Sequence, residues 1–187
     1  MLMEQRQRRI LQTMLVDDVG RMRALKAVHG LGLPDCWIGA GFVRNLVWDR
    51  LAGFATTTVL NDVDVVWYGQ EPACEADDLQ LEQRLTRIAP DFPWSVKNQA
   101  RMHLRNGDAP YHSTRDALTR WPETATAVAA RLNDRGGVEI LAPHGLDDLF
   151  AGIVRPVSRF VEEKRAELEA RWRAKGWQRQ WPFLRFE

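Results

Sequence analysis

Two aspartates separated by a single residue point most directly to chemistry. Asp62 and Asp64 lie in the run DVDVVWY, whose valines and aromatic residues are typical of a β-strand. Because side chains alternate along a strand, both carboxylates should project from one face, about 6–7 Å apart, while Val63 and Val65 point into the core. Two anions on one sheet face repel each other, and a cation between them relieves that repulsion. The spacing therefore predicts a metal site.

Magnesium is the ion that best suits such a pair. Mg²⁺ takes oxygen ligands, usually keeps several waters and draws further ligands from substrate phosphates, and Mn²⁺ is the alternative ion. An isolated pair of aspartates would more simply be a strand end whose acids are exposed or cap a neighbouring loop. The choice between these interpretations depends on what lies next to the pair.

A glycine turn precedes the pair in the sequence. The run WIGAGFVRNLVWDRLAG, residues 37–53, predicts a buried strand that ends at Gly39 and Gly41 and leads directly into a helix with Arg44 on its first turn. Glycine permits unusual backbone angles and the close approach of another group, although tight packing of helix on strand would also explain it. Free amides at a helix start, beside an arginine, bind phosphate oxygens. A phosphate site next to a Mg²⁺ site outlines a centre for nucleotidyl transfer.

The two motifs together carry a family resemblance. IGAGFVRN followed by DVDVVW resembles the nucleotidyltransferase fold of the DNA polymerase beta superfamily, in which a Gly-Gly or Gly-Ser turn precedes a hydrophobic-Asp-hydrophobic-Asp strand. The turn is also similar to the GGxVRD start of tRNA nucleotidyltransferases. With WSVKNQARMH, APHGLDDLF and RPVSRF added, the chain resembles small bacterial nucleotidyltransferase-like proteins over roughly residues 35–185.

The resemblance implies a role for each of these residues. Asp62 and Asp64 would be the catalytic acids and would hold two Mg²⁺ ions. Gly39 and Gly41 would approach the triphosphate of a bound NTP. Arg44 would contact the same triphosphate.

The sequence departs from the superfamily pattern at the third acid. Superfamily members usually carry another Asp or Glu on the next strand, which completes the metal site and helps to deprotonate the attacking hydroxyl. Ser95, in the run WSV, matches that position and can do neither as an anion. The other candidate is Glu139, in the run VEI, which is otherwise an exposed strand residue. Asn45 also stands where the tRNA enzymes have aspartate, and the turn reads Gly-Ala-Gly.

Further polar residues follow Ser95. Lys97, Arg101 and His103 alternate with other residues in PWSVKNQARMHL, so they should share the strand face of Ser95. If that face meets the acids, these side chains would bind phosphate or substrate, and Lys97 is the predicted nucleotide-binding residue among them. As part of an exposed alternating strand they would need no function.

These motifs require an alternation of helices and strands. Apolar spacing and turn residues predict an α+β chain with a small mixed β-sheet flanked by helices, which the resemblance makes nucleotidyltransferase-like. The expected strands are residues 36–41, 62–69, 93–104 and 137–143, and the expected helices are residues 4–28, 42–53, 75–90, 117–132 with a break at Pro122, 146–154 and 162–181. A single domain should result, with an N-terminal helix in residues 1–30 packed on a core of residues 31–187 that ends in helices.

Composition narrows the choice of partners. The chain has 187 residues and a formal net charge of +1, so it lacks the basic field that duplex-binding proteins usually carry. Nucleic acid therefore ranks below an NTP as a partner, although basic residues gather at both ends of the chain. No apolar stretch reaches the roughly 20 residues that span a bilayer, and the start does not resemble a signal peptide. A cytoplasmic protein without a membrane partner is expected.

The leading hypothesis is an enzyme, a Mg²⁺-dependent nucleotidyltransferase that moves an NMP group from an NTP to an acceptor and releases pyrophosphate. The first alternative is a nucleotide-binding module of the same fold whose activity was impaired with the loss of the third acid. The second is an RNA-binding protein that uses its basic ends, for which a steep salt dependence of RNA affinity would be diagnostic. The sequence does not choose the NTP, the acceptor or the oligomeric state.

Overall fold

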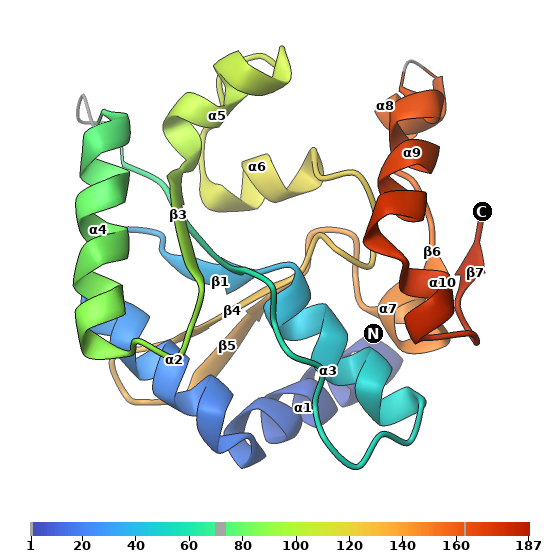
Figure 1. Ribbon diagram of the computed structural model, residues 1–187, viewed down its shortest axis with the longest axis horizontal. Helices are drawn as coiled ribbons and strands as arrows, with labels where there is room; N and C mark the ends of the chain where they lie inside the picture. The colour runs from blue at the N-terminus through green and yellow to red at the C-terminus, as the bar shows by residue number, and fades with distance from the viewer. Residues whose placement is uncertain (1, 70–73, 163) are drawn as a thin grey trace.

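A five-stranded β-sheet forms the centre of the protein (Figure 1). The computed structural model describes residues 2–69, 74–162 and 164–187. The strands of the sheet are β1 (Trp37–Gly39), β2 (Val63–Trp67), β3 (Trp94–Asn98), β4 (Ala129–Leu132) and β5 (Val138–Leu141). Their order is β3-β2-β1-β4-β5, with β2 and β3 parallel and the other neighbours antiparallel. The predicted mixed sheet, with the glycine, aspartate and serine strands as neighbours, is confirmed.

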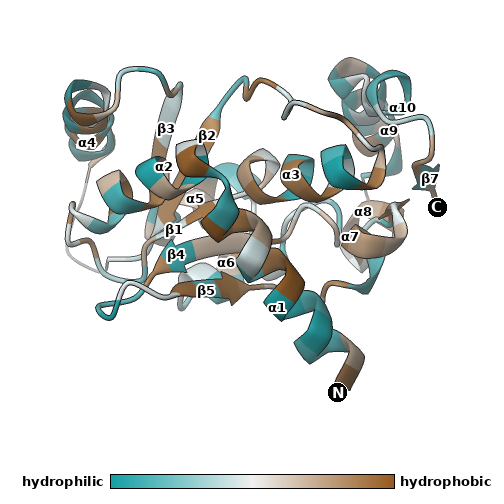
Figure 2. Cartoon of the chain, turned by 90° about the horizontal axis from the view of Figure 1, so that it is seen from below, coloured by the Kyte–Doolittle hydropathy of each residue, from teal (hydrophilic) through white to brown (hydrophobic). Residues whose placement is uncertain are grey.

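Helices cover the sheet, and α1 is hydrophobic at its N-terminal end and hydrophilic in the turns that follow (Figure 2). The helices are α1 (Leu2–Asp17), α2 (Val19–His29), α3 (Gly41–Leu51), α4 (Glu75–Ile88), α5 (Gln99–Asn106), α6 (Thr114–Thr119), α7 (Asp147–Ala151), α8 (Ser158–Glu162), α9 (Arg165–Lys175) and α10 (Trp177–Gln180). A small parallel pair, β6 (Ile153–Val154) and β7 (Arg185–Phe186), lies beside the C-terminal helices.

The two faces of the sheet are buried to different extents. One face, with Val63 and Val65, belongs to the main core together with apolar residues of α1, α2 and α3, as the alternation predicted. The other face carries a small cluster that includes Val66 and Leu118, the latter from α6. Asp64 lies between the two core valines in β2, so its side chain belongs to this second, thinly covered face.

The N-terminal segment differs from the single helix predicted for residues 4–28. The chain breaks at Asp18, whose carboxylate accepts a hydrogen bond from the Arg21 amide (2.8 Å) and so caps α2. Helix α1 lies against the edge strand β5, where Gln12 donates a side-chain hydrogen bond to the Val138 carbonyl (2.7 Å). The break lets α1 pack on β5 and α2 pack on β4.

The strand predicted for residues 93–104 is only half correct. It ends at Asn98, whose side chain accepts a hydrogen bond from the amide two residues later (3.0 Å) and caps α5. Local capping therefore overrides the alternation that continues in the sequence. As a consequence, Arg101 and His103 lie on a helix and do not share the strand face of Ser95.

The helix predicted for residues 117–132 is wrong over most of its length. Helix α6 ends before Pro122, and the alanine-rich part that follows forms β4. Ala129 and Ala130 are fully buried between β1 and β5, so strand pairing overrides their helix propensity. The closing helix predicted for residues 162–181 also divides, because Gly176 adopts a positive φ of 63° between α9 and α10.

The turn from β1 into α3 places an alanine in a glycine conformation. Ala40 caps α3 with φ 50° and ψ −124°, a region that L-residues with a side chain rarely adopt. Gly39, by contrast, stays in β1, where a Cβ atom would come within 2.8 Å of the Trp121 ring. The left-handed position of the turn thus falls between the two glycines that the sequence singled out, and Gly39 permits close ring packing.

Replacing Ala40 by glycine is expected to stabilise the protein. The change removes the Cβ atom from a strained conformation and should raise the free energy of unfolding by about 1 kcal/mol. The matched control is Ala170→Gly, an exposed interior position of α9, which should lower it by about 0.5–1 kcal/mol. Chemical denaturation measures both changes, and a loss of stability in Ala40→Gly would contradict the strain.

Candidate active site

The two aspartates lie at the beginning of β2. Asp62 is exposed and directly precedes the strand, whereas Asp64 is partly buried within it. Burial and the nearby charge of Asp62 raise the pKa of Asp64 from 3.8 to about 6, against the opposing effects of Lys175, Arg44 and Arg171. The structure therefore brings together the two carboxylates that the spacing singled out, and their charges repel each other.

The position of the third acid is occupied by serine. Ser95 on β3 is the register partner of Asp64 on the parallel strand β2. Glu139 lies on β5 at the other end of the sheet, where its carboxylate accepts a hydrogen bond from Arg131 Nε (2.8 Å) and its pKa is lowered by that bond. Glu139 thus belongs to a separate ion pair, and the residue beside the aspartate pair carries no charge.

Arg44 lies beneath the site as a buried cation. Only 6 % of the residue is exposed. Its guanidinium donates hydrogen bonds to Thr126 Oγ1 (3.1 Å) and Asn45 Oδ1 (3.0 Å) and lies over the Trp177 ring, 4.2 Å from the centroid. Burial lowers its pKa to about 10, and the nearby Glu123, Asp64 and Asp62 oppose that shift. A fixed positive charge therefore faces the acid pair from the first turn of α3.

Lys97 and Gly41 take different positions around this centre. Lys97 lies on β3, and its ammonium group is 3.2 Å from the Glu82 carboxylate of α4. Gly41 is the first residue of α3, and the first turn of a helix leaves amides without partners inside the helix. The helix start can therefore offer amide donors, whereas the lysine already has an anionic partner.

A cleft of about 300 Å³ opens over Asp64 and Ala40. The segment from α5 to α6 lines one side and the C-terminal helices line the other, and Figure 1 shows these elements facing each other. The polar and charged residues that line the cleft beside Asp64 are Asn106, Asp108, Arg120, Thr126, Lys164 and Arg171. Apart from Asp64 none of them was predicted, because they come from distant segments without a local motif.

The charges around the cleft favour an anionic ligand accompanied by a cation. Arg120, Lys164 and Arg171 line it together with Asp64 and Asp108, and Asp62 lies close enough to Asp64 for its charge to affect that carboxylate. Within the part of the chain that the structure describes, no three His, Cys, Asp or Glu residues group together as metal ligands. A metal held by the two aspartates would therefore draw its other ligands from water or from a bound phosphate.

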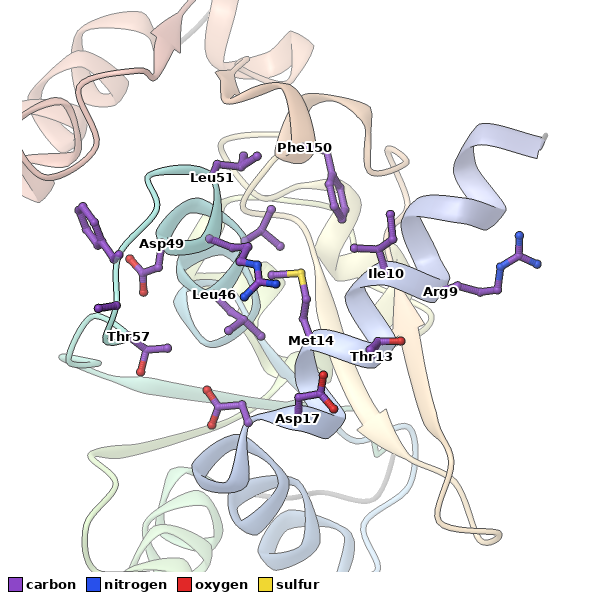
Figure 3. A pocket seen from close by; sticks show the side chains of 15 residues that line it. Arg9, Ile10, Thr13, Met14, Asp17, Leu46, Asp49, Leu51, Thr57 and Phe150 are labelled. Carbon is purple, nitrogen blue, oxygen red and sulfur yellow. The ribbon is translucent and has the colours of Figure 1, made fainter.

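A second, larger pocket lies away from this chemistry. It measures about 650 Å³ between α1 and the C-terminal part of α3, and Met14, Leu46 and Phe150 line it (Figure 3). Asp17 lies at its border together with Thr13. None of the predicted site residues lines this pocket, so its size does not identify it as the reaction centre.

Solved structures with a similar fold include a CCA-adding enzyme head domain and whole CCA-adding enzymes. The protein is 33 % identical to a protein whose NMR structure reveals a CCA-adding enzyme head domain, with a TM-score of 0.84 over 95 % of this chain and 94 % of that chain. A CCA-adding enzyme with CTP is 19 % identical, with a TM-score of 0.59 over 95 % of this chain and 43 % of that one. The CCA-adding enzyme of Thermotoga maritima, complexed with tRNA, is 20 % identical, with a TM-score of 0.58 and coverage of 95 % and 42 %.

The chain thus spans nearly all of the first relative but less than half of the two CCA-adding enzymes. None of the curated proteins matches it. Among the described residues, no helix combines the length and apolar character needed to cross a membrane. The model of a nucleotidyltransferase family matches residues 26–186, nearly the whole chain, and the resemblance seen in the glycine turn and the aspartate strand is confirmed. The protein belongs to this nucleotidyltransferase family.

Proposed function

We propose that the protein is a Mg²⁺-dependent nucleotidyltransferase that moves an NMP group from an NTP to an acceptor hydroxyl. The observation that carries this proposal is Asp64, within the range of the Asp62 charge, in a cleft that Ala40 at the start of α3 and three basic side chains also line. Membership of a nucleotidyltransferase family supports it. The acids, the arginines and the helix start each supply one part of the chemistry.

The acid pair fits a divalent ion. Burial and the charge of Asp62 raise the pKa of the Asp64 carboxyl group, and a bound cation would stabilise its ionised form. Asp62 and Asp64 would hold Mg²⁺, or Mn²⁺ in its place, and the ion would offset charge on the triphosphate and activate the acceptor oxygen. The amides at the start of α3, opened by Gly41, would bind phosphate oxygens, and Gly39 keeps the strand close to them.

The proposed transfer is an in-line displacement at the α-phosphorus. The acceptor oxygen forms a bond to this atom while the bond to the oxygen that bridges to the β-phosphate breaks, and pyrophosphate leaves with that electron pair. The hydroxyl proton passes to water, because Ser95 offers no carboxylate to take it. Arg44 contributes a fixed positive charge beneath the reacting groups, where burial strengthens its effect.

A nucleotide-binding module without efficient transfer is the second candidate. Ser95 is the observation that favours it, because the serine lies where a third acid would complete the centre. A missing general base commonly lowers a rate by about 10² to 10⁴. We infer that the wild-type protein binds NTP with Mg²⁺ but transfers slowly. The neighbours solved with CTP and with tRNA, which share only the fold, make CTP and an RNA end the first ligands to try.

Incubation of the protein with each α-labelled NTP, Mg²⁺ or Mn²⁺ and cell extract tests the transfer. Label should move from the NTP to a component of the extract with release of pyrophosphate, and the double variant Asp62→Asn/Asp64→Asn should transfer none. Treatment of the extract with ribonuclease distinguishes an RNA acceptor, whose labelling would be lost, from a protein or a small molecule, whose labelling would remain. Binding of NTP without any transferred label would support the binding module instead.

Removal of one acid should weaken ligand binding and increase the stability of the metal-free protein. Asp64→Asn removes a charge that burial and the nearby Asp62 disfavour, so the metal-free variant should unfold at a higher temperature than the wild type, with a gain of about 1–2 kcal/mol at pH 7. Mg²⁺ and ATP should raise the melting temperature of the wild type and leave that of Asp64→Asn or Asp62→Asn nearly unchanged. Equal ligand-induced shifts in all three proteins would exclude the pair as the metal site.

The stability gain should depend on pH in a defined direction. The pKa of Asp64 is about 6 in the folded protein and 3.8 in the unfolded reference, so the folded state binds this proton more tightly. Its contribution to the free energy of unfolding therefore falls as pH rises from about 4 to about 6. The advantage of Asp64→Asn should accordingly be small at pH 4 and full at pH 7.

Adding the missing carboxylate should strengthen the centre. Ser95→Asp places an acid on the register partner of Asp64, so it should tighten Mg²⁺ binding and raise the transfer rate, by up to about 100-fold. The matched control is Glu139→Gln, which removes an acid at the far end of the sheet and should leave both quantities unchanged. Weaker Mg²⁺ binding in Ser95→Asp would show that the third group lies elsewhere.

A further inference from the structure

One buried carboxylate lies outside the acid pair and takes no part in the proposed transfer. Glu123 lies between α6 and β4 and is fully buried. Its Oε1 atom accepts two hydrogen bonds from α9, from Arg171 Nε (2.9 Å) and from Trp172 Nε1 (3.0 Å). Burial of an ionised carboxylate is costly unless charged and hydrogen-bonding partners compensate it. The role of Glu123 therefore depends on its partners on α9.

Arg171 connects this carboxylate to the reaction centre. One third of its side chain is exposed, and it lines the cleft together with Asp64. Its charge also contributes to the pKa values of Asp64 and of Arg44, so it lies within electrostatic range of both. Among the described residues, Nε is the atom through which this guanidinium donates to protein. The two Nη groups at the cleft are thus available for another acceptor.

The arrangement is that of a prepared phosphate ligand. A guanidinium presents its donors in a rigid planar fork that matches phosphate oxygens, and fixing one edge leaves the other edge oriented. Arg171 and Arg44 both interact with the single charge of Glu123, so two cations share one buried anion and the cluster keeps a net positive charge. A side chain that is already ordered loses less entropy when the ligand binds.

We infer that Arg171 binds the triphosphate of the NTP and that Glu123 is the residue that positions it, which makes α9 part of the active site. This inference rests on the proposed function, because the ligand is the triphosphate of the same site. Chemically, the ligand is a polyphosphate anion at the end of the cleft nearest the C-terminal helices.

The first experiment measures the affinity of arginine variants for inorganic tripolyphosphate and for Mg²⁺-ATP by calorimetry. Arg171→Ala should weaken both affinities by about tenfold to 100-fold, since a charge-assisted bidentate contact is lost. Arg171→Lys should fall between that variant and the wild type, because lysine keeps the charge but not the fork or the Nε donor. The matched control is Arg173→Ala, an exposed arginine of the same helix outside the cleft, which should change both affinities less than threefold.

The second experiment tests whether Glu123 acts through Arg171. Glu123→Gln keeps an oxygen for both donors but removes the charge, so it should weaken the affinity by about threefold to tenfold and raise KM for the NTP more than it lowers kcat. In the Arg171→Ala background the same change should have no further effect. The control for stability is Leu168→Val, a buried residue of α9, which should lower the melting temperature and leave the affinity unchanged.

The outcomes separate this inference from the proposed function. Wild-type protein that binds neither Mg²⁺-ATP nor tripolyphosphate would overturn both. Normal affinity in Arg171→Ala, with a wild type that binds and transfers, would overturn only the role of Arg171. An unchanged or tighter affinity in Glu123→Gln, or additive effects in the double variant, would overturn the positioning role of Glu123.

Discussion

The burial of the Asp64 carboxylate beside the charge of Asp62 is the constraint on which the rest of this centre depends. The sheet holds this second acid on a partly buried face, where burial and then the charge of Asp62 raise its pKa to about 6. Cations from the first turn of α3 and from the C-terminal helices lie near this carboxylate. The centre thus combines two negative charges with several positive ones. A cation can compensate the aspartates while an anion compensates the basic side chains.

Two buried charges show how the fold meets that requirement. Arg44 is enclosed by the rings of Trp48 and Trp177, so its charge stays fixed although burial opposes it. Glu123 accepts two hydrogen bonds from α9 at one carboxylate oxygen and offsets part of the positive charge. Each charge would be unfavourable alone, and their compensation depends on elements from three distant parts of the chain.

The sequence was sufficient to predict what depends on local pattern. Alternation placed Asp64 opposite the core valines, and the strand run around Ser95 predicted the serine beside it. Alternation failed beyond Asn98, because a side-chain cap decided the local structure. The helix predicted through Ala129 failed because pairing with two strands determines a segment whose own propensity is helical.

The charged residues that line the cleft could not be predicted from local sequence patterns. Arg120, Lys164 and Arg171 carry no spacing signal, and they meet Asp64 only through tertiary packing. The role of Glu123 could not be predicted from the sequence either, since a single glutamate between α6 and β4 does not differ from other acidic residues in loops. Periodicity predicts which face of an element is buried, but it does not predict which distant element will lie over that face.

The ion pair between Glu123 and Arg171 also has a consequence for the order in which the molecule is assembled. A ribosome delivers the acid pair and Glu123 well before α9 has been synthesised, so the nascent chain holds a carboxylate that has no partner for burial. Without Arg171 and Trp172, burial of that carboxylate would leave a charge without partners, so the buried position of Glu123 is favourable only once α9 is present. Packing of α9 and burial of the loop before β4 are therefore energetically coupled, and one wall of the cleft is completed by a later part of the chain.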